Sequence, residues 1–155
     1  MAAVVKPKLQ VVAKLDGQCV THARTDVSVR DVKVTIDEPA ERGGTNQGLS
    51  PTETLMAALI GCTNVIGHKV AHKNGVKIDA MHVRLEMDFD RRGVTLTEEV
   101  EVPFPAGRLY VDVTTDADDA AIATVKRELA MFCPVSKVFR AAGTKLEEIW
   151  TVKRP

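Results

Sequence analysis

Cys133 stands at a position where a thiol could do chemistry, because Pro134 follows it directly. Proline disfavours a helical conformation in the residue before it and is well suited to the first position of a helix. We therefore expect Cys133 near the N-cap of a helix over 134–142. Free backbone N–H groups and the helix dipole stabilise a thiolate at such a position. The alternative is a buried cysteine at a break between two helices.

Cys62 lies beside Gly61 inside an apolar stretch, and Ala57 and Ala58 precede it by about one helical turn. Small neighbours leave room beside the sulfur for a substrate or for another element. On residue types alone, a core cysteine is the favoured interpretation. Glu53 lies nine residues earlier, which is about 14 Å along a straight helix and on roughly the opposite side. Activation of the Cys62 thiol would therefore need a cation from another part of the chain.

The remaining candidate ligands predict no metal site. His68 and His72 have the i, i+4 spacing that can chelate a metal on a helix, but Lys69 replaces the glutamate of the HExxH motif. No cysteine pair with zinc-ligand spacing accompanies them, so we expect two surface histidines. Cys19 falls in a predicted strand with no helix end beside it and is expected to be structural. Glycine motifs for nucleotides are absent, and we expect no cofactor.

The first third of the chain has the alternation of half-buried strands. Apolar residues recur with period two over 9–15, 27–29 and 32–36. Asp16 and Gly17 form a dipeptide typical of hairpin turns, which predicts a hairpin between the first two strands.

A loop and a long helix follow these strands. Residues 37–49 are rich in glycine, proline and asparagine, which predicts a loop with unusual backbone angles. Ser50 is a good N-cap, Pro51 suits the first helical position, and Glu53 lies three residues after the cap. The apolar stripe over 50–74 is broad, so we expect a helix that is buried on most sides.

The rest of the chain alternates between strand and helix signals, and the whole pattern predicts an α+β fold. The acidic segment 116–119 favours the start of a helix. The predicted strands cover 81–89, 94–102, 108–115 and 145–152, and the predicted helices cover 116–132 and 134–142.

Length and charge restrict the class of protein. A chain of 155 residues suits a single domain over 1–155. Lysine and arginine (21) balance aspartate and glutamate (21), which makes nucleic acid or an anionic membrane a poor first choice of partner.

The apolar stretch 55–66 is well short of the ~20 residues of a membrane span, and the N-terminus has no secretory pattern. Three cysteines make no disulfide framework, and we expect a cytoplasmic protein.

Several short runs of residues occur together in a fixed order, and as a set they resemble a known family. They are Asp37-Glu38-Pro39, Gly43-Gly44, Ser50-Pro51-x-Glu53, Ala57-Ala58-Leu59-x-Gly61-Cys62-Thr63 and Cys133-Pro134-Val135-Ser136-Lys137. This set resembles the OsmC/Ohr family of osmotically inducible and organic hydroperoxide resistance proteins. The resemblance extends from about residue 30 to the C-terminus and rests on two separate cysteine motifs.

The resemblance implies a fold and an activity. The family fold has antiparallel sheets around long central helices in an interlocked homodimer. By this resemblance, Cys62 attacks the peroxide, Cys133 resolves the sulfenic acid to a disulfide, and a dithiol such as dihydrolipoamide reduces the disulfide again. The fold must then bring the Cα atoms of the two cysteines within about 7 Å of each other.

The helix start departs from the best-studied branch of the family. In that branch a glutamate directly follows the proline and orients an arginine over the reactive thiol. Here Thr52 holds that place and Glu53 comes one residue later. Arg24 is the nearest candidate for the arginine, and Arg42 is a more remote one. The pattern is more similar to the broad OsmC-like branch.

Two functions of different classes stay open. The first is a cysteine-based peroxidase for organic hydroperoxides, with Glu53 and Arg24 as activators of the thiol. The alternative is a binding or redox-sensing domain that keeps the fold and both thiols without fast peroxide turnover. A metal site made of cysteine and histidine is disfavoured because the ligand spacing is missing.

Overall fold

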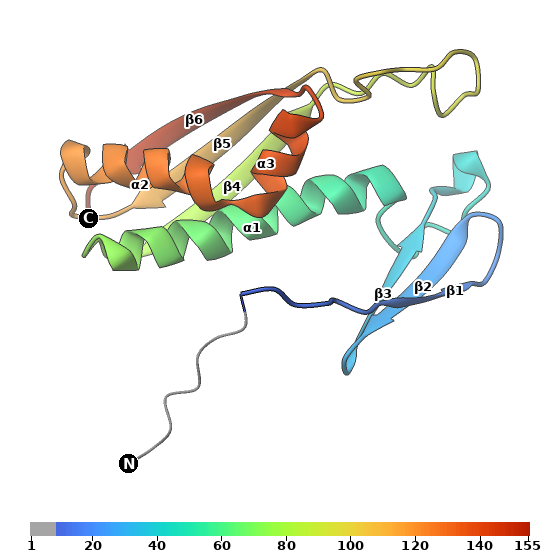
Figure 1. Cartoon of the computed structure of the whole chain (residues 1–155), viewed down its shortest axis with the longest axis horizontal. Helices are drawn as coiled ribbons and strands as arrows, with labels where there is room; N and C mark the ends of the chain where they lie inside the picture. The colour runs from blue at the N-terminus through green and yellow to red at the C-terminus, as the bar shows by residue number, and fades with distance from the viewer. Residues whose placement is uncertain (1–8) are drawn as a thin grey trace. The chain divides into compact units, whose positions relative to one another are not determined.

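The computed structural model describes residues 9–155. The chain divides into two compact units, Met1–Thr54 and Leu55–Pro155, and each has its own three-stranded sheet (Figure 1). A single domain over the whole chain stays a prediction. The α+β class is confirmed, since helices and sheets both make up the fold.

The first unit contains an antiparallel sheet in the order β1-β2-β3. The predicted hairpin at Asp16 and Gly17 is wrong, because both residues lie within β1, opposite Ser28 and Val27. The turn comes later, where the Thr21 hydroxyl accepts hydrogen bonds from the backbone N–H groups of Ala23 and Arg24. The predicted strand over 9–15 is also wrong, since this segment pairs with no strand of the described chain. The strands are β1 (Asp16–Cys19), β2 (Arg24–Val29) and β3 (Val32–Asp37).

The loop after β3 is organised around the buried carboxylate of Asp37. Its oxygens accept hydrogen bonds from the Thr45 hydroxyl at 2.6 Å and from the backbone N–H groups of Thr45 and Gln47. These hydrogen bonds hold the pKa of the Asp37 carboxyl below its ordinary value, and the bond from the Thr45 hydroxyl has the largest effect. A Cβ atom at Gly44 would overlap the Glu38 carbonyl, so glycine is required there. A short 3-10 helix, η1 (Ala40–Arg42), lies in this loop.

The long helix α1 (Pro51–Lys73) starts with the capping box that its sequence predicts. The Ser50 N–H donates to Glu53 Oε2 at 2.8 Å, and the Glu53 N–H lies 3.4 Å from Ser50 Oγ. Within one chain, the expectation of burial on most sides is wrong, because Leu55 and Val65 are 41% and 51% exposed. One narrow face is buried, and it consists of Leu59, Thr63, Gly67, Val70 and Ala71.

Within residues 9–155, α1 is also the one helix long and apolar enough to cross a membrane by length and composition. The apolar stretch is thus longer than the sequence suggested. The core helix of a globular protein passes the same test, and α1 uses its buried face in a protein core. The length of α1 is therefore weak evidence for a membrane span.

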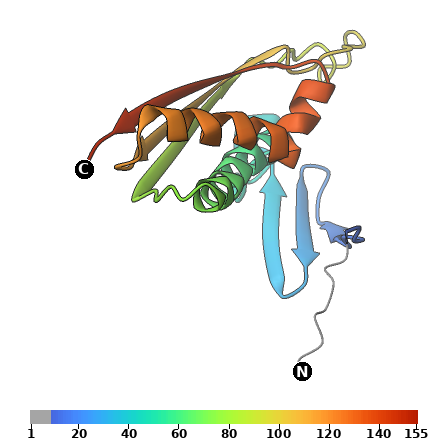
Figure 2. The same cartoon turned by 60° about the vertical axis from the view of Figure 1, so that its left-hand side comes forward.

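The second unit has a mixed sheet in the order β4-β5-β6. The pair β4/β5 is antiparallel, as expected, but β5 and β6 are parallel. Parallel neighbours need a crossover connection, and two helices provide it on the face of the sheet that also carries α1 (Figures 1 and 2). The elements are β4 (Ala80–Met87), β5 (Ala106–Thr114), α2 (Asp119–Phe132), α3 (Pro134–Ala141) and β6 (Lys145–Lys153).

The predicted strand over 94–102 is absent from the described chain, which forms turns there. The Arg92 side chain bonds to Asp90 and Glu98 and holds the turns together. Leu96 adopts a left-handed backbone conformation and is 92% exposed. The alternation in this segment produces no strand because β4 pairs with β5 instead.

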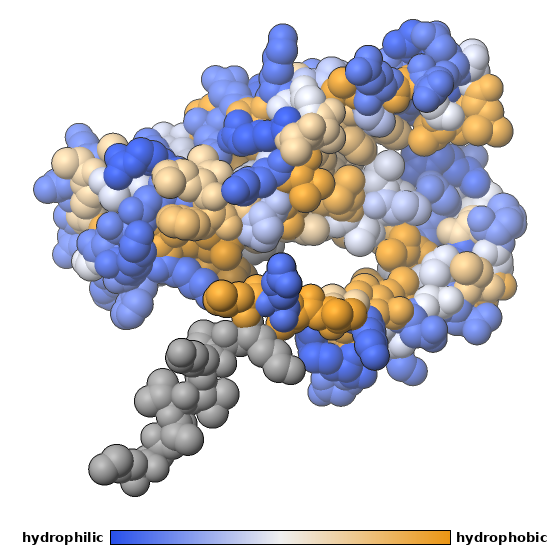
Figure 3. Space-filling view, in the orientation of Figure 1, coloured by the Kyte–Doolittle hydropathy of each residue, from blue (hydrophilic) through white to orange (hydrophobic). Residues whose placement is uncertain are grey.

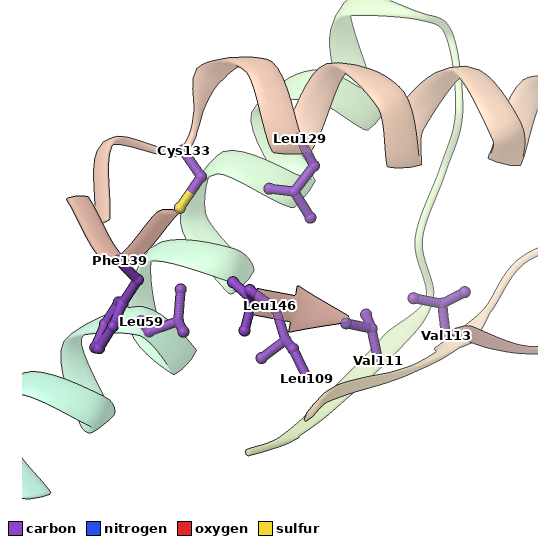
Figure 4. Close-up of a cluster of buried hydrophobic side chains, with 8 residues drawn as sticks. All are labelled: Leu59, Leu109, Val111, Val113, Leu129, Cys133, Phe139 and Leu146. Carbon is purple, nitrogen blue, oxygen red and sulfur yellow. The ribbon is translucent and has the colours of Figure 1, made fainter. Parts of the chain in front are cut away.

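The core of the second unit joins the helices to the sheet (Figure 4). Leu109 and Val111 of β5 are buried against Leu59 of α1 and Leu129 of α2. The predicted start of α2 is confirmed, since Asp118 Oδ1 accepts the Ala121 N–H at 2.8 Å. This core includes Cys133.

Candidate functional site

The structure brings the two cysteines of interest together in the second unit. Cys62 is on α1 and Cys133 joins α2 to α3, and their Sγ atoms are 3.1 Å apart although 71 residues separate them in the sequence. Both are free thiols. We call these two residues the thiol pair.

Cys133 is both a helix cap and a core residue. The sequence offered these two descriptions as alternatives, and both are correct. Its backbone is extended (φ −69°, ψ 108°), and its sulfur accepts the Ser136 N–H of α3 at 3.5 Å. The Ser136 hydroxyl donates to the Cys133 carbonyl at 3.1 Å. The side chain is 1% exposed, and Figure 4 shows it at the junction of two helices among apolar side chains. Peroxide or reductant therefore has poor direct access to this sulfur.

Cys62 is half-buried and has a different environment. Burial is the main cause that raises the pKa of the Cys62 thiol, and the neighbouring Cys133 thiol raises it further. The Val135 N–H, in the first turn of α3, acts in the opposite direction. Backbone N–H groups in the first turn of α3 thus donate hydrogen bonds to both sulfurs. The surroundings of Cys62 favour the protonated thiol.

The two predicted activators lie in the first unit, where each has partners of its own. The Arg24 guanidinium binds Asp26 through Nε and Nη2 at 3.1 and 3.0 Å, and its Nη1 binds Gln47 at 2.7 Å. The hydrogen bond to Asp26 is the first cause that raises the pKa of Arg24. Glu53 closes the capping box, and the Ser50 N–H is the first cause that lowers the pKa of this carboxyl. Their proposed action on Cys62 stays a prediction.

Arg42, the more remote candidate, is the arginine whose charge acts on Glu53. It is among the causes that lower the pKa of the Glu53 carboxyl. The Arg42 Nε also donates to Glu38 at 2.6 Å. Within the first unit, Glu53 is thus coupled to Arg42, whereas Arg24 binds Asp26.

The sequence predicted that N–H groups at the start of α3 act on Cys133, but not that one of them acts on Cys62. Ser136 and the N–H of Val135 contact the thiol pair, and both follow Cys133 within three residues. For Ser136 the signal was present, because the side chain of a cap residue accepts a hydrogen bond from the N–H two or three positions later. The Val135 N–H acts on Cys62 of α1, which no spacing near Cys133 predicts. The spacing of the run Cys133-Pro134-Val135-Ser136 therefore indicates the Ser136 contact alone.

The other candidate ligands are two histidines of α1 and the third cysteine, Cys19. His68 and His72 are exposed on α1, as expected, and no group of three metal-binding side chains occurs within residues 9–155. Cys19 lies in β1, as predicted, but is exposed and so is no core residue.

A shallow apolar hollow of about 300 Å³ lies between α1 and α2. Ile66, one turn after Cys62, lines it, and so does Phe132, the neighbour of Cys133 in the sequence. Lys69, Val70 and Lys73 complete the lining. Apolar surface on the second unit is visible in Figure 3.

Comparison with known proteins identifies relatives by family and by fold. The model of the family described as OsmC-like protein matches residues 44–148, which is more than half of the chain. No curated protein matches. An OsmC-like protein from Mycoplasma pneumoniae has a TM-score of 0.78 at 12% identity, covering 93% of this chain and 99% of its own.

Other solved structures with the same fold carry names that mention hydroperoxides, and two of them follow. The organic hydroperoxide resistance protein OsmC from Legionella pneumophila has a TM-score of 0.68 at 17% identity and covers 93% of this chain and 99% of its own. The organic hydroperoxide resistance protein OhrB of Bacillus subtilis has a TM-score of 0.59 at 18% identity, with 91% and 98% covered. At these identities the likeness concerns the fold.

Proposed function

Because the chain belongs to the family of OsmC-like proteins, we propose that it is a thiol-dependent peroxidase that reduces organic hydroperoxides. The observation that carries the proposal is the 3.1 Å distance between the sulfurs of Cys62 and Cys133. A peroxide-related redox role also agrees with the names of solved proteins that have the same fold.

The thiol pair suits a two-step oxidation. The Cys62 thiolate attacks the O–O bond, becomes a sulfenic acid and releases an alcohol after the leaving oxygen takes up a proton. The Cys133 thiol then condenses with the sulfenic acid, which forms the disulfide and releases water. Because the sulfurs already touch, the second step needs little movement. A dithiol such as dihydrolipoamide would return both cysteines to thiols.

Differences between the two cysteines support the assignment of roles. Cys62 is partly accessible, whereas Cys133 is 1% exposed and belongs to the core. The attacking sulfur must reach the peroxide, while the resolving sulfur needs to reach only Cys62. The apolar hollow beside Ile66 and Phe132 offers a surface for the organic part of a hydroperoxide.

A homodimer is part of the proposal. Leu55 and Val65 of α1 are large apolar side chains that stay 41% and 51% exposed in one copy, and a partner surface would cover them. We also propose a cytoplasmic location, where reducing conditions keep thiols free.

A second candidate function is redox sensing or binding without fast turnover. It is favoured by the raised pKa of the Cys62 thiol and by the capping role of Glu53. A thiol reacts with peroxide as the thiolate, so a raised pKa slows the first step unless a cation offsets it.

Single-turnover oxidation of the reduced protein distinguishes the two functions. We would add one equivalent of cumene hydroperoxide, or of hydrogen peroxide, and follow thiol loss and intact mass. The peroxidase predicts rapid loss of two thiols and two hydrogens per chain, faster with the organic peroxide. Cys62→Ser should abolish this, and Cys19→Ser, which changes an exposed cysteine of the first unit, is the matched control. If the thiols survive stoichiometric peroxide, the peroxidase is refuted and the sensing or binding function remains.

A further inference from the structure

The reduced thiol pair has the properties of a bidentate soft ligand, independent of any reaction with peroxide. Both cysteines are free and their sulfurs are 3.1 Å apart. Thiolate sulfur selects soft centres over magnesium or calcium. No third metal-binding side chain joins them in the described part of the chain.

The sulfur–sulfur distance determines which soft centre fits. With bonds of about 2.3 Å, as in zinc thiolates, a linear S–M–S unit needs sulfurs about 4.6 Å apart. With the same bonds at a right angle, the sulfurs are about 3.3 Å apart. Structural zinc needs four ligands, and this site offers two. A pyramidal centre with two open positions matches both the distance and the ligand count.

We infer that Cys62 and Cys133 together bind organic arsenic(III) compounds that carry two exchangeable oxygen ligands. Arsenic(III) is pyramidal, and one organic substituent leaves two positions for sulfur. Cys133 is held by the Ser136 N–H and by core packing, and Cys62 of α1 packs against the same core. This preorganisation lowers the entropic cost of binding.

The site has an open side next to Cys62. Cys62 is partly exposed, and a Cβ atom placed on Gly61 would meet no other atom within 4 Å. Arsenic can therefore approach the Cys62 sulfur first and close the chelate with Cys133 second. The organic substituent would remain on the exposed side.

The exchange balances without a redox partner. Each thiol loses its proton, two As–S bonds form, and the two bonds from arsenic to oxygen break. Each of the two oxygen ligands, as hydroxide, takes up the proton of one thiol and leaves as water, and arsenic keeps its oxidation state. The protons depart with the oxygen, so the raised pKa of the Cys62 thiol is no obstacle. Once bound, the pair would be unable to react with peroxide.

Phenylarsine oxide is the probe for a direct test. We would add one equivalent to the reduced protein and measure intact mass, then challenge the adduct with excess 2-mercaptoethanol or with 2,3-dimercaptopropanol. One phenylarsenic group per chain should survive the monothiol and leave with the dithiol. Cys62→Ser and Cys133→Ser should bind about a hundredfold more weakly because the chelate is lost. Cys19→Ser should bind as the wild type does.

A second measurement needs no variant. After treatment with phenylarsine oxide, alkylation by iodoacetamide in denaturant and peptide mapping should show Cys62 and Cys133 protected and Cys19 modified, whereas all three are modified in the untreated protein. Unprotected Cys62 and Cys133 in this measurement, or an adduct lost in Cys19→Ser in the intact-mass experiment, would overturn the inference. Binding without peroxide turnover would support the inference and refute only the peroxidase.

Discussion

At the scale of single residues, the two sulfurs of the thiol pair touch but have different environments. Cys133 accepts an N–H at the start of α3 and is buried, whereas Cys62 is partly accessible and its thiol has a raised pKa. Accessibility thus assigns first contact with a reagent to Cys62. The fraction of Cys62 present as the thiolate then controls the rate of its reaction with that reagent.

The pH dependence of Cys62 alkylation follows from its raised pKa. Burial and the Cys133 thiol both disfavour the thiolate, so alkylation should increase with pH and reach half its maximal rate above 9.0, the ordinary thiol value. Stopped-flow alkylation of Cys19→Ser, with peptide mapping to assign the site, measures this. Cys133→Ala should shift the midpoint downward, because one of the two causes is removed. A midpoint below 9.0 would contradict the raised pKa of the Cys62 thiol.

Asp37 should make the first unit sensitive to acid. Its folded pKa is lowered, so the carboxylate contributes stability above its unfolded pKa, and this contribution is lost as pH falls through the folded value. Limited proteolysis at decreasing pH should show cleavage within 38–49 below about pH 4. Asp37→Asn should be cleaved there at neutral pH already, while the exposed Asp31→Asn serves as the control. Equal resistance of both variants would contradict the anchoring role.

At the scale of elements, α1 combines a strong local start with one-sided burial. The capping box at Ser50 and Glu53 is formed by residues close in sequence. Burial depends on what α1 faces, and only a narrow stripe around Leu59 and Thr63 meets the core. Substitutions on the two sides of this helix should therefore differ in cost.

Leu59→Ala should lower the free energy of unfolding by about 3 kcal/mol, because it leaves a cavity in a fully buried position. At protein concentrations low enough to dissociate the proposed dimer, Leu55→Ala, on the exposed side of the same helix in one copy, should change the free energy of unfolding by no more than about 0.5 kcal/mol. Urea denaturation followed by circular dichroism measures both. Similar losses in the two variants would mean that Leu55 is also covered, as in a dimer.

At the scale of the whole molecule, the proposed homodimer explains the exposed apolar residues of α1. Val65→Glu places a charge on that surface and should increase the dissociation constant of the dimer at least about tenfold. Analytical ultracentrifugation over a range of concentrations measures the shift. Leu96→Glu, at an exposed turn of the second unit, is the control. A monomeric wild type would refute the homodimer.

Local signals were enough to predict much of the chain. Ser50-Pro51-x-Glu53 predicted the start of α1, Cys133-Pro134 predicted the cap of α3, and the alternation over 81–89 predicted β4. Each of these depends on residues within one turn or one strand, so neighbouring residues contain all the information required. The two cysteine motifs also indicated the family, and the match to the family model confirmed it.

Pairing between distant segments could be decided only by packing in three dimensions. The alternation over 9–15 and 94–102 looks like that of β4, but a strand needs a partner, and these segments have none in the described chain. Two other features also join residues that are distant in the sequence. They are the parallel pairing of β5 with β6 and the 3.1 Å contact between the sulfurs of Cys62 and Cys133. Hydrogen-bond partners and buried neighbours come from the folded core, so no local pattern could specify them.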